Sequence, residues 1–345
     1  MKKLFIGVLS LILVMISVNI MAHAEDELYY WQTEDGNFEY CYSINEDNTA
    51  TIWGIGFLES SKIPDPYIIP DAIDGHTVTA ISGTKIDETS NATVFENGRR
   101  KHEPYFYNNW AWEDTIIIPE SVQTIGKNAF QFIEARIIVP SSVHTIGDKA
   151  FWGCERLIGS DLNLENLTHL GNNAFERCVS LKSIQLPDTL ASIGTNPFAR
   201  CASLSIIEIS AQHPYLAYQD GVLFEKATKR LVTYLPSNAN EEYSVPDGIL
   251  EIDAYAFYNN ENLASVNIPD SVTVIGSNAF NSDPLKRVSR VIEVPSSVIE
   301  IGEHAFISTA TLIVEKDSYA HTYAVEHDIP YQLTNTNSDM SWLGN

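Results

Sequence analysis

The stretch "IPDSVTVIGSNAF", from Ile268 to Phe280, returns three more times in this chain with small changes. The other copies are "IPESVQTIGKNAF" (118–130), "VPSSVHTIGDKAF" (139–151) and "VPSSVIEIGEHAF" (294–306). A glycine turn before a short helix can hold a phosphate, but phosphate loops follow G-x-G-x-x-G or G-x-x-x-x-G-K-[ST], and these copies follow neither pattern. Repetition at a short period instead indicates a solenoid of stacked, equivalent coils.

The register of the repeat is set by an apolar residue and a glycine, with phenylalanine four positions after the glycine. The glycines are Gly126, Gly147, Gly171, Gly194, Gly276 and Gly302, and Asp253 takes this position in "ILEIDAYAF". The phenylalanines are Phe130, Phe151, Phe175, Phe198, Phe257, Phe280 and Phe306. The steps between these glycine positions span 21 to 26 residues, apart from 59 residues between Gly194 and Asp253. Such steps are typical of leucine-rich coils.

Each residue type in the coil has a structural interpretation. In "LKSIQLPDTLASIGTNPFARCASL" (181–204), alternating apolar residues predict a strand with one buried face, and Pro187 ends it because proline cannot donate to a ladder. Gly194 is expected in a turn with positive φ, and Asp253 tolerates the same conformation. Because no coil can bury its apolar face alone, we predict a mainly β solenoid of about eight coils with short helical turns.

The cysteines follow the same register. Cys154, Cys178 and Cys201 each lie three residues after a repeat phenylalanine, in adjacent coils. We interpret them as a stack of buried thiols, although a disulfide between neighbouring coils is an open alternative that depends on geometry. Cys41 lies outside the repeats and is expected to be unpaired. No Cys/His spacing typical of zinc sites is present, so neither a metal nor a cofactor is expected.

The quoted residues resemble the BspA-like leucine-rich repeat family, whose phrase is matched by 181–204 and by "LASVNIPDSVTVIGSNAF" (263–280). The resemblance covers about Ile69 to Leu333 and implies extracellular recognition or adhesion without naming a ligand. It also implies a hairpin insertion in the long step and a closing helix near Ser318–His327.

The ends and insertions complete the expected organisation. Residues 1–24 resemble a secretory signal peptide, with lysines, an apolar run and "AHA" before Glu25. A β cap is expected at 25–60, repeats at 61–333 with insertions at 82–104 and 211–242, a helical cap at the C-terminal end, and a flexible tail at 334–345. The mature protein is therefore expected to be secreted or associated with the cell surface, without an integral membrane segment.

Two surfaces are candidates for partner binding. The first is the outward-facing residue of each strand, a partly acidic column that includes Asn163, Gln185, Glu208, Asn267 and Glu293. The second is the first insertion, where the loop runs on to Asp114 and carries Arg99, Arg100, Tyr105, Trp110 and Trp112. Long loops are often functional, and tryptophan and arginine anchor many interfaces. The alternatives are a solvated strand face, and tryptophans that pack on the N-terminal cap.

The formal net charge of −24 argues against a nucleic-acid partner. No catalytic motif such as G-x-S-x-G or H-E-x-x-H is present, so no enzyme activity is expected. We therefore predict a secreted, monomeric recognition or adhesion scaffold that binds an extracellular protein or glycan. The alternatives are a structural envelope component and a hydrolase built on the solenoid.

Overall fold

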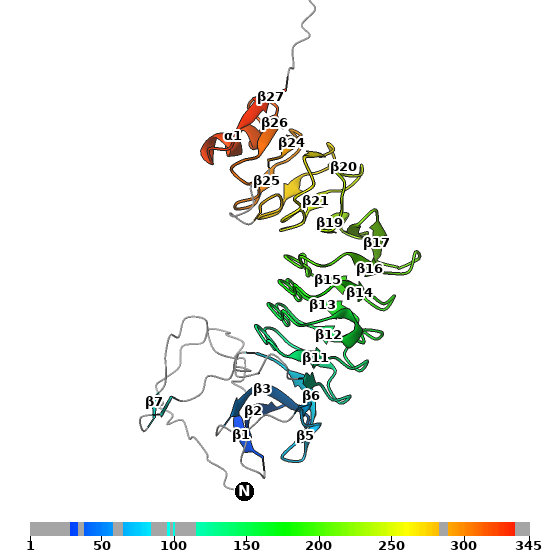
Figure 1. Cartoon of the computed structure of the whole chain (residues 1–345), viewed down its shortest axis with the longest axis vertical. Coiled ribbons are helices and arrows are strands. Elements are labelled where there is room, and N and C mark those ends of the chain that lie inside the picture. The colour runs from blue at the N-terminus through cyan, green and yellow to red at the C-terminus, as the bar shows by residue number, and fades with distance from the viewer. Residues whose placement is uncertain are drawn as a thin grey trace, which may run out of the picture.

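The computed structural model describes residues 28–33, 38–57, 65–83, 115–282 and 289–334, and the backbone of 95–96 and 99–100. These residues form a β solenoid of about nine coils stacked along one long axis (Figure 1). The predicted fold class is confirmed: within the described residues the regular structure is strand, apart from one α-helix and one 3₁₀ turn.

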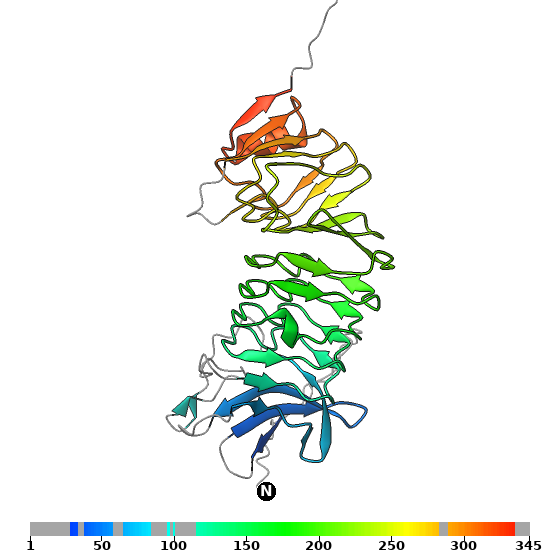
Figure 2. The same ribbon diagram turned by 45° about the vertical axis from the view of Figure 1, so that its right-hand side comes forward.

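Most coils contribute one strand to each of two rows of parallel strands along the stack (Figure 2), and each row is divided into separate sheets. The first strands are β4 (Tyr67–Ile68), β9 (Thr115–Ile117), β11 (Arg136–Ile138), β14 (Ser183–Gln185), β16 (Ile206–Glu208), β20 (Glu242–Ser244), β22 (Ser265–Asn267), β24 (Val291–Val294), β26 (Thr311–Val314) and β27 (Tyr331–Leu333). The second strands are β6 (His76–Ile81), β10 (Thr124–Ile125), β12 (Thr145–Ile146), β13 (His169–Leu170), β15 (Ser192–Ile193), β19 (Arg230–Tyr234), β21 (Glu251–Ile252), β23 (Val274–Ile275) and β25 (Glu300–Ile301). The coil that contains Asn163 has no strand-ending proline, and there the 3₁₀ turn η1 (Gly159–Asp161) stands in place of a first strand.

The remaining strands lie at the end of the stack or in insertions. β1 (Tyr29–Gln32), β2 (Phe38–Ile44) and β3 (Ala50–Phe57) are antiparallel, and β3 pairs with β6, so they extend the second-strand sheet at the N-terminal end. β5 (Ala72–Ile73) also pairs with β6, and β7 (Phe95–Glu96) pairs with β8 (Arg99–Arg100). β17 (Leu216–Gln219) and β18 (Val222–Glu225) form a hairpin that continues into β19.

The segment where a closing helix was expected contains α1 (Tyr319–Glu326), whose first turn is capped by Ser318. The Tyr323 hydroxyl donates a hydrogen bond to the carbonyl of Gly302 at 3.1 Å, and its ring meets Phe306 edge-on at 6.0 Å. The helix therefore packs on the turn of the last repeat.

The repeat phenylalanines form the aromatic ladder that their spacing predicts. Phe130, Phe151 and Phe175 stack with ring centroids 5.3 to 5.5 Å apart and planes within 5°. Phe257, Phe280 and Phe306 also stack, with centroids 4.8 to 5.4 Å apart and planes within 11°. Backbone amides around these rings donate alternately to the next coil and within their own coil. The Phe130 amide donates to the Ala150 carbonyl of the next coil, whereas the Ala129 amide donates to the Gly126 carbonyl of the same coil. Each coil is thereby fixed to its neighbour along the turn edge.

The predicted reason for the repeat glycines is wrong. None of the six repeat glycines, nor Asp253, has a positive φ; left-handed residues lie two positions after the glycine, as at Asn128 (φ 56°) and Lys149 (φ 54°). Glycine is required because consecutive coils approach closely. A Cβ on Gly276 would lie 2.3 Å from the backbone nitrogen of Ala254, and one on Gly194 would lie 2.4 Å from that of Asn172. The position is thus a contact between backbones.

One coil lies hidden in the 59-residue step. β19 pairs in parallel with β21, and Tyr234 takes the place of the repeat phenylalanine, 5.1 Å from the Phe257 ring. The Tyr234 amide donates to Ala256, as a repeat phenylalanine does to the coil that follows it. Part of the region expected as an insertion therefore completes a coil, which explains why the stack holds about nine coils and not about eight.

The stacked thiols are present, and no disulfide joins them. Cys154, Cys178 and Cys201 are fully buried, and each Sγ–H donates to a phenylalanine carbonyl of the preceding coil at 2.9 to 3.2 Å. Asn260 occupies the same column, and its Nδ2 donates to the carbonyl of Tyr234. The column therefore requires a small hydrogen-bond donor and does not depend on sulfur.

Candidate binding surface

The first-strand face presents the outward column that the sequence predicts. Asn163, Gln185, Glu208, Asn267 and Glu293 are all exposed, while their neighbours along the chain alternate into the core. In the ladder, Gln185 lies opposite Glu208, and Asn267 lies opposite Glu293. These two pairs belong to separate sheets, so the structure does not bring all five residues into one patch.

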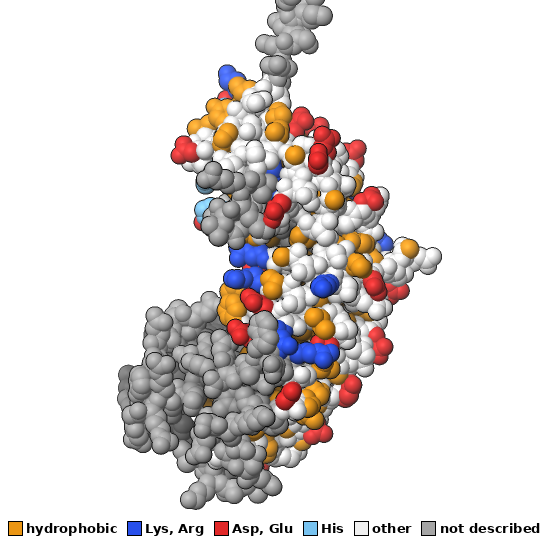
Figure 3. Space-filling view, in the orientation of Figure 1, with side chains coloured by type: hydrophobic (Ala, Val, Ile, Leu, Met, Phe, Trp, Pro, Cys, Tyr) orange, Lys and Arg blue, Asp and Glu red, His pale blue; other side chains and the backbone are white. Residues whose placement is uncertain are grey.

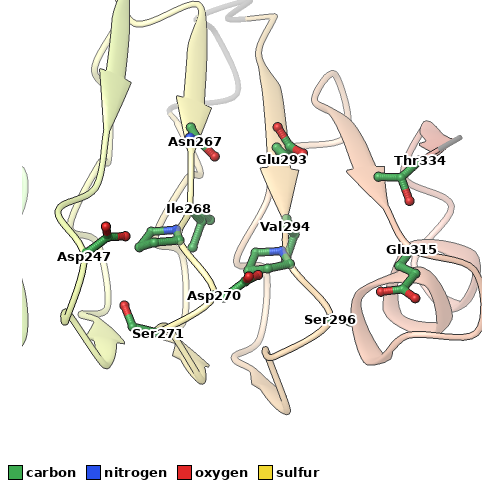
Figure 4. Close-up of a pocket in the computed structure, with 12 residues that line it drawn as sticks. Asp247, Asn267, Ile268, Asp270, Ser271, Glu293, Val294, Ser296, Glu315 and Thr334 are labelled. Atoms are coloured by element: carbon green, nitrogen blue, oxygen red, sulfur yellow. The ribbon is translucent and has the colours of Figure 1, made fainter. Parts of the chain in front are cut away.

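A groove of about 560 Å³ crosses the ends of β20, β22, β24 and β26. Figure 4 shows Asn267 and Glu293 at the ends of adjacent strands, with Asp247 and Asp270 projecting from successive turns beside them. The lining is completed by side chains of the same turns and of the chain after β26 and β27. The full lining is Asp247, Asn267, Ile268, Pro269, Asp270, Ser271, Glu293, Val294, Pro295, Ser296, Glu315 and Thr334.

The groove is negatively charged. Asp247, Asp270, Glu293 and Glu315 are exposed at the surface, and no lysine, arginine or histidine lines it. Figure 3 shows acidic side chains recurring along the right-hand margin of the described part of the molecule, with the densest group near its upper end. Carboxylates on a concave surface attract cationic groups by direct pairing and by long-range steering, both of which weaken as salt increases. The groove therefore favours a partner that presents positive charge.

The repeat itself builds this arrangement. Pro269 and Pro295 end their strands, and the residues after them, Asp270 and Ser296, turn outward. Hydroxyls of the next residues tie the turns together: Ser271 Oγ accepts a hydrogen bond from the Gly248 amide at 3.0 Å, and the Ser297 hydroxyl donates to a carbonyl of the preceding coil at 2.9 Å. The polar side chains are consequently held on anchored turns at the spacing of the coils.

Most residues of the groove were not predicted from the sequence. Only Asn267 and Glu293 were predicted, whereas Asp247, Asp270 and Glu315 come from turns or from the end of a strand. A signal was available, because an acidic residue follows the strand-ending proline in several coils, at Glu120, Asp188, Asp247 and Asp270. Acids after proline are also typical of ordinary turns, so this pattern alone does not indicate a binding site.

The residues of the first insertion stay a prediction. Arg99 and Arg100 form β8, whose backbone pairs with β7, and their side chains are not described. Tyr105, Trp110 and Trp112 lie outside the described residues. The prediction that these five side chains bind a partner therefore lies outside the described residues.

Other kinds of site find little support in the described part of the chain. No group of three or more histidine, cysteine or acidic side chains there could hold a metal ion. A second hollow of about 710 Å³ lies beside α1, over Phe306 and Ile329, but it contains no predicted residue. Across the same residues, no helix has the length and apolar character that crossing a bilayer requires.

Comparisons with known proteins agree with this architecture. A leucine-rich repeat protein from Eubacterium ventriosum has a similar structure, with a TM-score of 0.56 and 19% identity over 84% of this chain and 73% of that one. Two more distant structures are the pneumococcal vaccine antigen PcpA (TM-score 0.48, 18% identity, 89% of this chain and 99% of that one) and a leucine-rich cell surface protein from Faecalibacterium prausnitzii (0.43, 20%, 93% and 98%). At these identities the likeness concerns the fold alone.

A search among curated proteins gave no match. The family model for the BspA type leucine rich repeat region, in contrast, matches residues 102–219 and 235–318 in six copies. These ranges contain the Phe and Cys ladders and most of the acidic groove. The chain belongs to the BspA-type leucine-rich repeat family.

Proposed function

We propose that the chain is a secreted, non-catalytic recognition scaffold that binds a cationic segment of an extracellular protein, or a cationic glycan, in the groove at the ends of β20, β22, β24 and β26. The observation that carries this proposal is the groove itself, which no cationic side chain lines and which has four exposed carboxylates, one on the predicted strand column and three on the turns and strand end beside it. A binding role also agrees with a family defined by its repeats and not by catalytic residues.

Within each coil the recurring residues are buried and the variable residues are exposed, and this arrangement supports a binding role. The recurring isoleucine, phenylalanine and cysteine side chains are buried in ladders and cannot contact a partner, as with Ile275 and Phe280, which are fully buried. The residues that vary between coils, such as Asn267 and Glu293, are the exposed ones. Variation at exposed positions of a rigid stack is how solenoids acquire different partners.

The proposal can be tested with a binding array. The purified mature chain is applied to arrays of host matrix proteins, synthetic peptides and glycans, beside the variant Asp270→Asn/Glu293→Gln, in which two groove carboxylates become neutral isosteres. The control is Gln185→Ala/Glu208→Gln, which alters two facing residues of the strand column in the N-terminal half.

We expect cationic array members to bind the wild-type chain and the control but not the groove variant. An array with no signal above an unrelated acidic protein would count against recognition altogether. If the variant Trp110→Ala/Trp112→Ala loses binding to the array while the groove variant keeps it, the binding surface is the insertion and not the groove. Cleavage after Ala24 during expression in a secreting bacterial host, read by mass spectrometry, tests the secreted state.

A further inference from the structure

Within the described residues 115–282, both strand ladders are interrupted together at one place, whereas between β11 and β14 only the first-strand ladder is broken. No backbone hydrogen bond joins residues 181–208 to residues 230–282, although both segments are fully described and are internally bonded from coil to coil. The first-strand ladder stops at β16 and restarts at β20, and the second-strand ladder stops at β15 and restarts at β19. Figure 1 shows the coils of β15 and β16 and the coils of β19 and β21 as two stacks, with β17 at the margin between them.

β19 separates two hydrophobic cores. All five of its residues are buried. Val232 packs in the core of the N-terminal half, whereas Leu231 and Tyr234 pack in the core of the C-terminal half. The strand is therefore a septum, and each half of the solenoid buries its own set of apolar side chains against it.

Side chains replace the missing backbone bonds across the interruption. The Arg230 guanidinium donates to the carbonyls of Ile193 at 2.8 Å and Gly194 at 3.4 Å. The Asp253 carboxylate accepts a hydrogen bond from the Asn196 amide at 3.0 Å and lies 3.2 Å from the same guanidinium. Arg200 lies over the rings of two tyrosines from the C-terminal half, 5.3 and 4.7 Å from their centroids.

These side-chain bonds leave polar atoms unsatisfied. Both side-chain polar atoms of Asn196, which is fully buried, and the Nε atoms of Arg200 and Arg230 have no hydrogen-bond partner within the structure. A buried polar atom without a partner destabilises the folded state, and opening that hydrates such atoms is correspondingly easier. The interruption is thus the place where separation of the coils breaks the fewest satisfied bonds.

We propose that the solenoid is articulated at β19. Residues 115–210 and 230–334 are two cooperative units that reorient about the N-terminal side of β19 while each stack stays intact. The Arg230–Asp253 pair belongs to the C-terminal unit, and its hydrogen bonds to Ile193, Gly194 and Asn196 of the N-terminal unit are the clamp that limits this motion. The articulation is independent of any particular ligand, and it lets the groove of the C-terminal unit and the strand face of the N-terminal unit be presented at different angles.

Distance measurements between spin labels test the articulation. The exposed residue after the strand-ending proline provides equivalent labelling positions at Glu120, Asp188 and Asp270, which lie three coils apart along the stack. The pair Asp188→Cys/Asp270→Cys spans the septum, and the pair Glu120→Cys/Asp188→Cys is the control within one unit. The native repeat cysteines are fully buried and should not be labelled.

We expect the distance distribution across the septum to be broader than the control distribution, and to broaden further when Asp253→Ala is added. Equal, narrow distributions that Asp253→Ala leaves unchanged would show one rigid body and overturn the proposal. Hydrogen exchange gives a second readout that needs no variant. Amides in 196–200 should exchange about tenfold or more faster than those in 173–177 and 255–259, and equal protection in all three turns would contradict the articulation.

Discussion

Asp253 stands where six other coils have glycine, and its carboxylate lies 3.2 Å from the guanidinium of Arg230. In the other coils a Cβ at this position would meet the backbone or side chain of the preceding coil. At Asp253 the preceding coil contributes β19 and no glycine turn, so a side chain fits. One exception in the repeat thus marks the place where the stack changes from backbone to side-chain bonding.

The close approach of coils predicts the effect of Gly276→Ala. The new Cβ would lie 2.3 Å from the Ala254 nitrogen, and backbone in a hydrogen-bonded stack cannot yield without loss of ladder bonds. We expect the free energy of unfolding to fall by about 1 to 3 kcal/mol, measured by denaturant unfolding. Ser277→Ala is the neighbouring control and should change stability by less than about 0.5 kcal/mol. Equal stability of Gly276→Ala and the wild type would disprove the close-contact explanation.

The Asp253 carboxyl predicts a pH dependence of stability. Burial raises its pKa to about 6, and the adjacent Arg230 opposes that rise. Because the folded-state pKa exceeds the unfolded value, folding takes up a proton, and stability from this group is lost as the pH rises through about 6. Between pH 4 and pH 7 the effect amounts to at most about 3 kcal/mol.

Asp253→Asn should remove this dependence. The measurement is the difference in unfolding free energy between wild type and Asp253→Asn from pH 4 to pH 8, which cancels the contributions of the other acids. Asp148→Asn is a matched control, since the Asp148 carboxylate also accepts an amide hydrogen bond from the next coil, at 2.7 Å, but is not deeply buried. A difference that does not vary with pH would be inconsistent with a titrating Asp253.

The clamp predicts strong coupling between its two residues. Arg230→Met removes the partner of a carboxylate that is only 2% exposed and leaves the Ile193 carbonyl without its donor. Loss of one member of a buried pair costs about 3 to 5 kcal/mol. The double variant Arg230→Met/Asp253→Gly should be more stable than the sum of the single changes predicts. Additive losses in this double-mutant cycle would mean that the two side chains do not act as a pair.

The thiol column predicts unreactive cysteines. Burial raises the pKa of the Cys201 thiol to about 12 and that of Cys178 well above its ordinary value. Thiolate, and not thiol, attacks aromatic disulfide reagents. We therefore expect the repeat cysteines to react at pH 8 only as fast as the protein unfolds, whereas a labelled position such as Asp188→Cys reacts at once. Rapid reaction of the native repeat cysteines would contradict the burial of this column.

The strands, the aromatic ladder and the thiol stack were predictable because they recur in register. Seven phenylalanines at one spacing have few structural explanations, and the strand alternation around Ile184 fixes which side chains point inward. The role of the repeat glycines was not predictable in the same way. A glycine in a turn usually signals a positive φ, and only the packed coils reveal that it is the neighbouring backbone that excludes a side chain.

Tyr234 and the groove escaped prediction for a different reason. Tyr234 fills a phenylalanine position, but the hairpin before it and the missing glycine hide its register. The groove arises from side chains about 20 residues apart in sequence, such as Asp247 and Asp270, that only the stacking of coils brings together. The position of a residue within its own repeat can be predicted from the neighbouring sequence. A surface that several repeats build together cannot, because it depends on how the coils stack.

The most direct test of the binding groove is the affinity for a defined cationic probe. A Lys-Ser repeat peptide and a glucosamine oligosaccharide represent the protein and glycan arms, and a neutral glucose oligosaccharide is the control ligand. Titration calorimetry at low and high salt compares the wild type, Asp270→Asn/Glu293→Gln and Gln185→Ala/Glu208→Gln.

If the groove binds cationic partners, one of the two charged probes should bind the wild type. The affinity of that probe for the groove variant should be at least about tenfold lower than for the wild type, a loss of about 1.4 kcal/mol in binding free energy. The affinity for the wild type should also decrease from low to high salt. The Gln185/Glu208 variant should bind as the wild type does. Equal affinity for the wild type and the groove variant, or loss only in the Gln185/Glu208 variant, would contradict the assignment of the groove as the binding surface.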